Sequence, residues 1–271
     1  MVAASKMAKH GVRSLAVLLP ALIAIILWQT VVDFTPSLAF FIGSPTLVVR
    51  AFAMEVTSSA QIGSFNFPAG KLFVDTAVTG WEAIAGFFLG SLFGTILGLW
   101  FSLTPGVSRV FRPYIIALGT APLFAFAPII VLWFGVGIES KVLVATLSTI
   151  FVALMQAFRG ANETDRNLIQ VAKSFGATDR QAFRKIVIPS AAVWVINGFR
   201  LNVGFALLGA FLGEFINSSD GLGHLILVSG GLYNIPLVLV GVMMISALGL
   251  ALTAGVDSLE PGTKRLLSKI C

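Results

Sequence analysis

Long stretches without a charged residue constrain the fold of this chain more than any other feature. An α-helix needs about 20 consecutive apolar residues to cross the hydrocarbon core of a bilayer. Five uncharged intervals reach or approach that length, and a sixth is interrupted by one arginine. They are Ser14–Val32, Ala83–Ser108, Pro113–Ile138, Val142–Phe158, Ile235–Val256 and, with Arg200 inside it, Ile186–Gly213. The pattern predicts an all-α integral membrane protein with about six transmembrane helices.

The composition agrees with a chain that lies mostly in lipid. Of 271 residues, 57% are hydrophobic and 11% are charged, and the mean hydropathy is +0.95. Soluble domains carry about a quarter charged residues. The uncharged intervals take up so much of the sequence that no separate soluble domain fits, so we expect one membrane domain.

The positive charges predict the orientation of this domain. If the N-terminus is cytoplasmic, only Arg50, Lys71 and Lys141 among the 18 Lys and Arg fall on the outer side, apart from Arg200 within a span. This split follows the positive-inside rule. The expected segments are a cytoplasmic N-terminus at 1–13, a transmembrane domain at 14–258 with an external loop at about 33–76 and a cytoplasmic loop at about 159–189, and a cytoplasmic C-terminus at 259–271. The external loop, with its short apolar runs, is expected to contain interfacial helices.

Four glycines in the second predicted span recur at every fourth residue. They are Gly86, Gly90, Gly94 and Gly98, and they place a face without side chains along one side of the helix. Such a face permits close packing of two helices in a membrane. We prefer this interpretation to a contact with a transported solute.

Several kinds of chemical site are missing from the sequence. The cations form no Arg-rich arm, so we expect no nucleic-acid partner. The single cysteine is Cys271, and His10 and His224 lie far apart, so we expect no metal site. The only Gly-Lys pair, Gly70–Lys71, lacks the rest of a phosphate-binding loop. We expect no catalytic residue and no cofactor bound by this chain.

The charged segment between the fourth and fifth spans is patterned like two short helices. Leu168, Ala172 and Phe175 recur at helical spacing and predict an apolar stripe on the first helix. Gly176 then permits a sharp turn, and Thr178 is a candidate N-cap for the second helix.

The second helix has a capping partner and a stripe of its own. Gln181 lies three residues after Thr178, as a capping box requires. Phe183, Ile186 and Val187 form the stripe. A helix pair of this kind could pack beneath its own bundle or dock into a groove of another protein, and the pattern alone favours neither.

This segment resembles the EAA loop of binding-protein-dependent ABC importer permeases. The family pattern is Glu-Ala-Ala, three residues, Gly, nine residues, Ile, one residue, Leu-Pro. The matching residues here are Gln170-Val171-Ala172, Gly176, Ile186 and Ile188-Pro189. Every spacing matches, while Gln170, Val171 and Ile188 replace the family's Glu, Ala and Leu.

Similarity extends from about Gly43 to the sixth span. It points to the branch that contains the nitrate, taurine, aliphatic sulfonate and thiamine-precursor permeases. The supporting motifs are Ser44-Pro45, Ala127-Pro128-Ile129, Leu132-Trp133-Phe134-Gly135, Ser174-Phe175-Gly176-Ala177, Gly198-Phe199-Arg200, and Glu214 followed by Gly221-Leu222-Gly223.

The resemblance implies the permease bundle of a type I ABC importer in the inner membrane of a prokaryote. The cytoplasmic loop would be a coupling helix that docks on ATP-binding cassette ATPase subunits, which hold the ATP and Mg. The other implied partners are an extracytoplasmic substrate-binding protein and a second permease copy. The residues implied to contact the ATPase are Gln170, Val171, Ala172, Phe175, Gly176, Ala177, Phe183, Ile186 and Pro189, with Gly176, Ala177 and Phe183 as the best candidates.

Four further residues are candidates for the translocation path. Arg200 lies about twelve residues into its span, near the membrane centre. It would either attract an anion or, as we prefer, pair with carbonyl groups of a neighbouring helix. Pro122 and Pro128 are expected to kink the third span, either statically or along a transport path. Glu214, with Asp220 and His224, fits a solvated outer loop better than an outer gate or a binding-protein contact.

The importer hypothesis has two rivals. A self-sufficient secondary transporter of a small anion would need carboxylates within its helices, whereas the acidic residues here are predicted at the ends of spans. A membrane scaffold would leave the patterned cytoplasmic loop without a purpose. The subgroup and Arg200 favour a small anionic solute such as a sulfonate, nitrate or carboxylate.

Overall fold

The computed structural model describes residues 19–57, 60–62, 65–67, 70–103, 105–216 and 218–267. The expected cytoplasmic N-terminus and the first residues of the first span, up to position 18, lie outside these ranges, as do His10 and Cys271. The chain divides into two compact units. One is Met1–Leu72 with Ile226–Gly241, and the other is Phe73–Leu225 with Val242–Cys271.

The first unit contains an apolar helix and the segment predicted as an external loop. The helix is described from Leu19 to Phe34. It is followed by α2 (Pro36–Ile42) and α3 (Pro45–Thr57). The strands β1 (Ala60–Ile62) and β2 (Phe65–Phe67) then pair antiparallel. Short helices were expected in this segment, and the strand pair was not.

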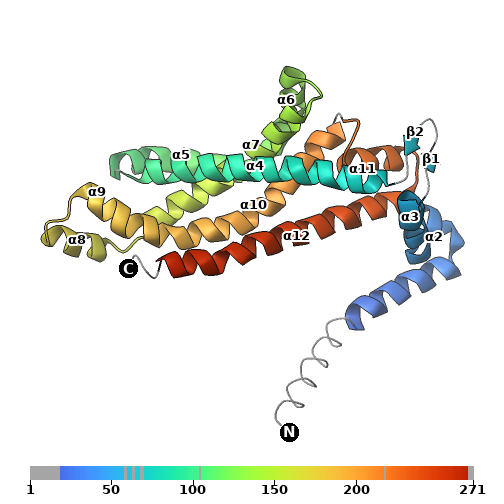
Figure 1. The fold of residues 1–271 in the computed structure, drawn as a ribbon, viewed down its shortest axis with the longest axis horizontal. Coiled ribbons are helices and arrows are strands. Elements are labelled where there is room, and N and C mark those ends of the chain that lie inside the picture. Colours follow the sequence, from blue (N-terminus) through green and yellow to red (C-terminus); the bar gives the residue numbers. More distant parts are fainter. Residues whose placement is uncertain are drawn as a thin grey trace, which may run out of the picture. The chain divides into compact units, whose positions relative to one another are not determined.

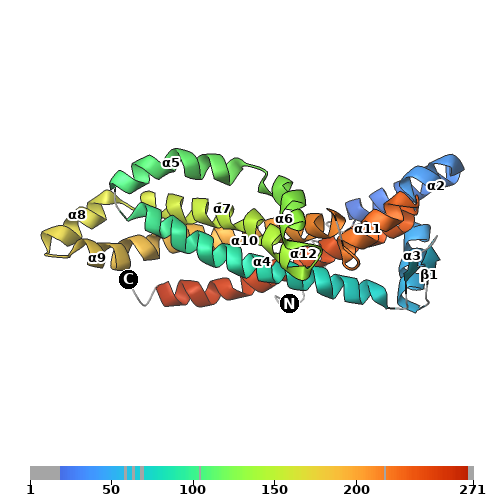
Figure 2. The ribbon, with the colours of Figure 1, turned by 90° about the horizontal axis from the view of Figure 1, so that it is seen from above.

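The second unit holds most of the long helices (Figures 1 and 2). Its elements in chain order are α4 (Lys71–Ser102), α5 (Pro105–Thr120), η1 (Leu123–Phe126), α6 (Ala127–Phe134), α7 (Ile138–Asn162), α8 (Arg166–Ser174), α9 (Asp179–Ala182), the π-helical η2 (Phe183–Val187) and α10 (Ile188–Ile216). Two further helices belong partly to it, α11 (Leu222–Gly231) and α12 (Ile235–Leu267).

Within the residues that the structure describes, four helices are long and apolar enough to cross a membrane. They cover Lys71–Ser102, Ile138–Asn162, Asp179–Ile216 and Ile235–Ser258. The all-α membrane class is therefore confirmed. These helices contain the fourth, fifth and sixth predicted spans and most of the second, which was expected to run on to Ser108. The second begins well before its predicted start, because Asp75 and Glu82 lie inside the helix and are buried there. The expectation that a charged residue marks the end of a span is therefore wrong for this helix.

The third predicted span is broken and not merely kinked. The helix α5 ends at Thr120, a 3-10 turn follows, and α6 has only eight residues. Pro122 lies in the break, where its carbonyl accepts the Ala125 N–H at 2.8 Å. Pro128 is in the first turn of α6, where a missing N–H leaves no helical hydrogen bond unmade. The expectation of two kinks inside one helix is wrong for both prolines.

The glycine face of α4 packs directly on α7, as predicted. A Cβ added to Gly90 would lie 2.7 Å from the Thr146 carbonyl oxygen and 2.9 Å from Thr149 Cβ. A Cβ on Gly98 would lie 2.9 Å from Ala157 Cβ. These distances leave no room for a side chain, so the two helices approach each other closely along several turns.

We predict that Gly90→Ala destabilises the protein by about 1–3 kcal/mol, because the added methyl group must displace the α7 backbone. The measurement is the temperature at which the purified protein loses its monodisperse elution in mild detergent. Gly204→Ala is the matched control, since a Cβ there meets nothing within 4 Å and alanine favours the helix. Equal melting temperatures for the two variants would contradict the close packing.

Candidate functional site

The loop predicted to be cytoplasmic folds into the two helices that its pattern predicts, at one end of α10 in both Figure 1 and Figure 2. The first, α8, ends in a compact turn. Gly176 has a φ of +86°, a conformation that glycine adopts without strain. The Gly176 N–H donates to the Lys173 carbonyl at 2.9 Å, and the Ala177 N–H donates to the Ala172 carbonyl at 3.0 Å. These two bonds form a Schellman motif, which gives Ala172 and Gly176 of the EAA pattern a structural role.

The second helix starts with the predicted capping box. The Thr178 hydroxyl accepts the Gln181 N–H at 3.3 Å, and the Gln181 side chain accepts the Thr178 N–H at 2.9 Å. An ion pair between Lys173 and Asp179 spans the turn. The start of α8 is also capped, by Asp165, whose side chain accepts the Asn167 N–H at 2.8 Å. Both helices are thus held at their ends by specific hydrogen bonds.

The helix α8 exposes an apolar stripe. Leu168 is 54% exposed, Val171 is 55% exposed and Phe175 is 88% exposed. These residues are spaced by three and four positions and share one side of the helix. No residue of α8 is buried. An exposed apolar stripe of this kind is typical of a surface that another protein covers.

The second helix instead packs against its own bundle. Phe183 is partly buried beside Ala161, Val187 and Ala191, which form a small core, and Ile169, on the side of α8 that faces away from the stripe, packs against the same core. The two interpretations left open by the sequence therefore apply to different parts of the loop. Internal packing describes Phe183, and the open surface lies on α8.

The other residues implied to contact the ATPase differ in their exposure. Gln170 is exposed, while Ala172, Ala177, Ile186 and Pro189 are half-buried. Ile186 belongs to the π-helical segment η2, and Pro189 is the second residue of α10. The π-helix was not predicted, because the apolar spacing of the sequence does not distinguish it from an α-helix.

Arg200 lies in the middle of α10 and has a carboxylate partner. Its Nε donates to Asp257 Oδ1 of α12 at 2.6 Å, and the two side chains are 38% and 48% exposed. The preferred expectation, pairing with backbone carbonyls of a neighbouring helix, did not include this carboxylate partner. Asp257 is not among the expected partners of Arg200 because the sixth span was expected to end near Val256, whereas α12 continues to Leu267.

Glu214 is fully buried, so the expectation of a solvated loop is wrong. It lies near the end of α10, with Glu82 of α4 against it and Lys141 of α7 paired with Glu82 at 3.3 Å. The sequence interpretation missed Glu82 and Lys141, and it expected no close carboxylates within the spans. The sequence signal for a buried Glu214 is the Gly221-Leu222-Gly223 motif that follows it, since those two glycines pack on the Glu214 side chain.

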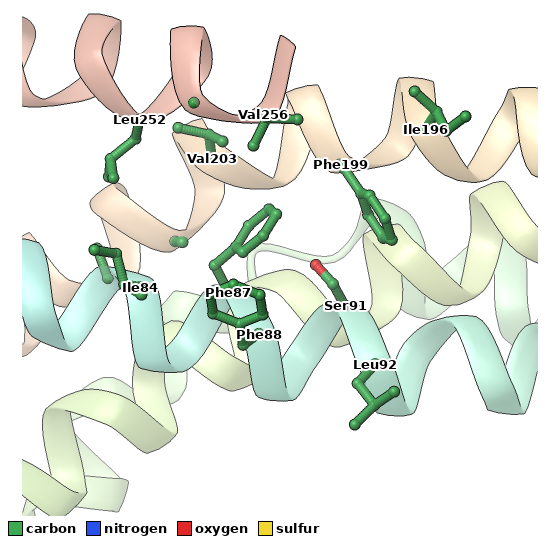
Figure 3. Close-up of a pocket in the computed structure, with 13 residues that line it drawn as sticks. Ile84, Phe87, Phe88, Ser91, Leu92, Ile196, Phe199, Val203, Leu252 and Val256 are labelled. Carbon is green, nitrogen blue, oxygen red and sulfur yellow. The ribbon is translucent and has the colours of Figure 1, made fainter. Parts of the chain in front are cut away.

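An apolar cavity of about 430 Å³ lies between α4, α10 and α12. Figure 3 shows Phe87 and Phe199 directed toward each other across it, and their ring centroids are 6.0 Å apart. Ser91 is the one residue with a polar side chain in the lining, and its hydroxyl accepts a hydrogen bond from Asn202 at 2.9 Å. No charged side chain lines the cavity.

Metal ligands do not gather in the part of the chain that the structure describes. There, no group of three or more His, Cys, Asp and Glu residues is placed to hold a metal ion. His224 lies in α11.

Known proteins with a similar sequence or fold share the permease organisation. A family model described as "Binding-protein-dependent transport system inner membrane component" matches residues 87–265. The riboflavin transport system permease protein of Chloroflexus aurantiacus is 31% identical over 85% of this chain and 82% of that protein. A putative aliphatic sulfonates transport permease protein of Bacillus subtilis is 28% identical over 86% of this chain and 80% of that protein.

A solved structure supports the fold. The MetNI methionine ABC transporter in an inward-facing conformation includes a chain that aligns with a TM-score of 0.54 at 18% identity, over 69% of this chain and 96% of that chain. The matched family, the apolar helices and the helix pair at the end of α10 agree with one another. This chain belongs to the family of inner membrane permease components of binding-protein-dependent ABC transport systems.

Proposed function

We propose that an ATPase subunit docks on the apolar stripe of α8, defined by Leu168, Val171 and Phe175, and that its ATP-driven movement is transmitted to this permease subunit there. The subunit is a multi-pass membrane protein and not an ATPase, since members of its family act with separate ATPase and binding-protein subunits. One observation carries the proposal. A helix with this much exposed apolar surface is held rigidly by a Schellman motif and two caps.

Rigid attachment matters because a soft loop would absorb any movement of its partner. The helix α9 continues without a break in helical structure into η2 and α10, and the bonded turn at Gly176 joins α8 to it. The small core around Phe183 anchors the start of that segment to Ala161 of α7. In the proposed mechanism, closure of the ATPase dimer moves α8, and the movement passes to the transmembrane helices. Gly176 and Ala177 act in it as the turn that sets the angle of the pair.

We predict that Phe175→Asp removes ATPase activity that co-purifies with the wild-type protein, because a charge in a docked apolar surface must be desolvated. The measurement is vanadate-sensitive ATP hydrolysis of tagged protein extracted from its native membrane in mild detergent. Arg166→Asp is the control, since it also places a carboxylate in the exposed first turn of α8 but about 140–200° around the helix from the three stripe residues. Phe183 is unsuitable for this test, because its contacts are with the protein's own core.

Absence of ATPase from the wild-type preparation, under conditions that preserve related complexes, would contradict the importer assignment. It would favour the self-sufficient transporter. ATPase retained by Phe175→Asp, with the wild-type complex intact, would contradict docking through the stripe alone.

The assembly proposed around the subunit has four further parts. We propose that it lies in the inner membrane of a prokaryote, with both termini cytoplasmic, as the positive charges indicate. Two copies of this chain would form the transport path, with an ATPase below each copy. An extracytoplasmic binding protein would deliver the solute, and ATP with Mg would bind in the ATPase.

The solute is proposed to be a small anion, with Arg200 on its route. Relatives of similar identity carry names that specify sulfonates and riboflavin, so the family alone does not select the solute. The support for an anion is the partly exposed Arg200 guanidinium in mid-helix, whose partner is a carboxylate. An anionic solute presents the same kind of acceptor as Asp257 and would compete with it for the guanidinium. Pro122 and Pro128, at the break between α5 and α6, are placed on the path by the same proposal.

We predict that Arg200→Ala lowers uptake of the transported anion by about tenfold or more, the effect of losing one charge-assisted contact of about 1.5–3 kcal/mol. The measurement is uptake into proteoliposomes that contain the ATPase and the loaded binding protein, tested with a sulfonate, nitrate and a carboxylate. Arg109→Ala, at an exposed position on α5, is the control. Unchanged uptake by Arg200→Ala would remove Arg200 from the path.

A further inference from the structure

The buried carboxylate of Glu214 joins three helices at one end of the bundle. Its Oε1 accepts a hydrogen bond from the Thr79 hydroxyl of α4 at 2.7 Å. Its Oε2 accepts the Gly223 N–H, in the first turn of α11, at 2.7 Å. Glu214 and Thr79 are both 0% exposed. The end of α10 is thus bonded to α4 and to the start of α11 through one side chain.

Three successive N–H groups at the start of α11, those of Gly221, Leu222 and Gly223, are bonded by side chains of other helices. The Leu222 N–H donates to Thr79 Oγ1 at 2.9 Å, and the Gly221 N–H donates to Asp75 Oδ1 at 2.9 Å. The first N–H groups of a helix have no partner within it, and here α4 and α10 supply the acceptors. Because these bonds are made to the backbone, they fix the position and direction of the first turn of α11.

The turn before α11 is held from the side of α7. Lys141 donates to the Ser218 hydroxyl at 2.6 Å, and that hydroxyl donates to the Asp220 carbonyl at 2.6 Å. Gly221 has a φ of +103°, and a Cβ there would lie 2.6 Å from Glu214 Oε2. A side chain at this position would therefore both strain the backbone and displace the carboxylate.

We propose that Glu214 is a positioning residue for transport, which makes the start of α11 move together with α10. The inference rests on the proposed docking of α8, since α10 is one end of the helical segment Asp179–Ile216 that begins at the docking loop. Movement imposed at the cytoplasmic end reaches Glu214 through this segment. The Glu214 and Thr79 bonds then pass it to α11 at the opposite end, where the solute enters.

The hydrogen bonds of the cluster suit a positioning role better than a role in stability alone. Replacing buried charged groups by apolar residues of similar size often leaves stability unchanged. Apolar contacts are not directional, so they would let the first turn of α11 slide against α10. Hydrogen bonds to three successive backbone N–H groups prevent such sliding. The cluster therefore contributes more to the fixed orientation of α11 relative to α10 than to the stability of the fold.

The test compares Thr79→Ser with Thr79→Val in proteoliposomes containing the ATPase and the binding protein. Serine keeps the hydroxyl that bridges Leu222 and Glu214, whereas valine has the same shape without it. We expect wild-type behaviour from Thr79→Ser. For Thr79→Val we expect basal ATP hydrolysis to be retained, with transport per ATP hydrolysed, and stimulation by the loaded binding protein, reduced about tenfold. Glu214→Gln should behave like Thr79→Val, and Glu139→Gln, at an exposed position of α7, is the control.

Two results would overturn the inference. In one, folded Thr79→Val and Glu214→Gln keep full stimulation and full transport per ATP. In the other, both variants lose transport only in proportion to the folded protein recovered, as a purely structural role requires. Failure of the docking proposal would look different, since ATPase would then co-purify with Phe175→Asp as it does with the wild-type chain. Failure of the importer assignment would differ again, since no ATPase would co-purify even with the wild-type chain.

Discussion

The close contact of α7 with glycine faces on two sides sets the geometry of the second unit. In a bilayer the lipid tails are as apolar as leucine, so helices associate through tight packing more than through the hydrophobic effect. Ala145 of α7 lies between Gly86 of α4 and Gly209 of α10. A Cβ on Gly86 would lie 2.9 Å from the Ala145 carbonyl carbon, and one on Gly209 would lie 2.6 Å from Ala145 Cα. The spacing of the three helices is therefore determined by backbone contact.

Other features of the unit depend on this spacing. Lys141 reaches Glu82 and Ser218 only because α7 lies close to both α4 and the end of α10. At the other end of α7, a Cβ on Gly160 would lie 2.7 Å from Trp194 Cβ, so the base of the loop that contains α8 is also fixed by a glycine contact. Glycine contacts thus place both the exposed stripe of α8 and the buried cluster around Glu214 at defined positions along the same three helices.

The sequence predicted local features well and long-range partners poorly. The glycine face, the turn at Gly176 and the Thr178–Gln181 capping box depend on residues a few positions apart, and all three were predicted. Glu214 and Arg200 were interpreted wrongly, because their partners Thr79 and Asp257 are 135 and 57 positions away in the chain. Treating each charge as the boundary of a span also hid Glu82 and Lys141. A charged residue can lie inside a membrane helix when another helix supplies its partner, and a single sequence does not show which helix that is.

The length of the segment Asp179–Ile216 has a mechanical consequence. Its 38 residues extend about 57 Å at 1.5 Å per residue, nearly twice the hydrocarbon thickness of about 30 Å. A helix of that length amplifies rotation, because a tilt of about 5° about one end displaces the other end by about 5 Å, close to one helical pitch. Small angular changes at the membrane surface are thereby converted into displacements large enough to rearrange the packing on the far side.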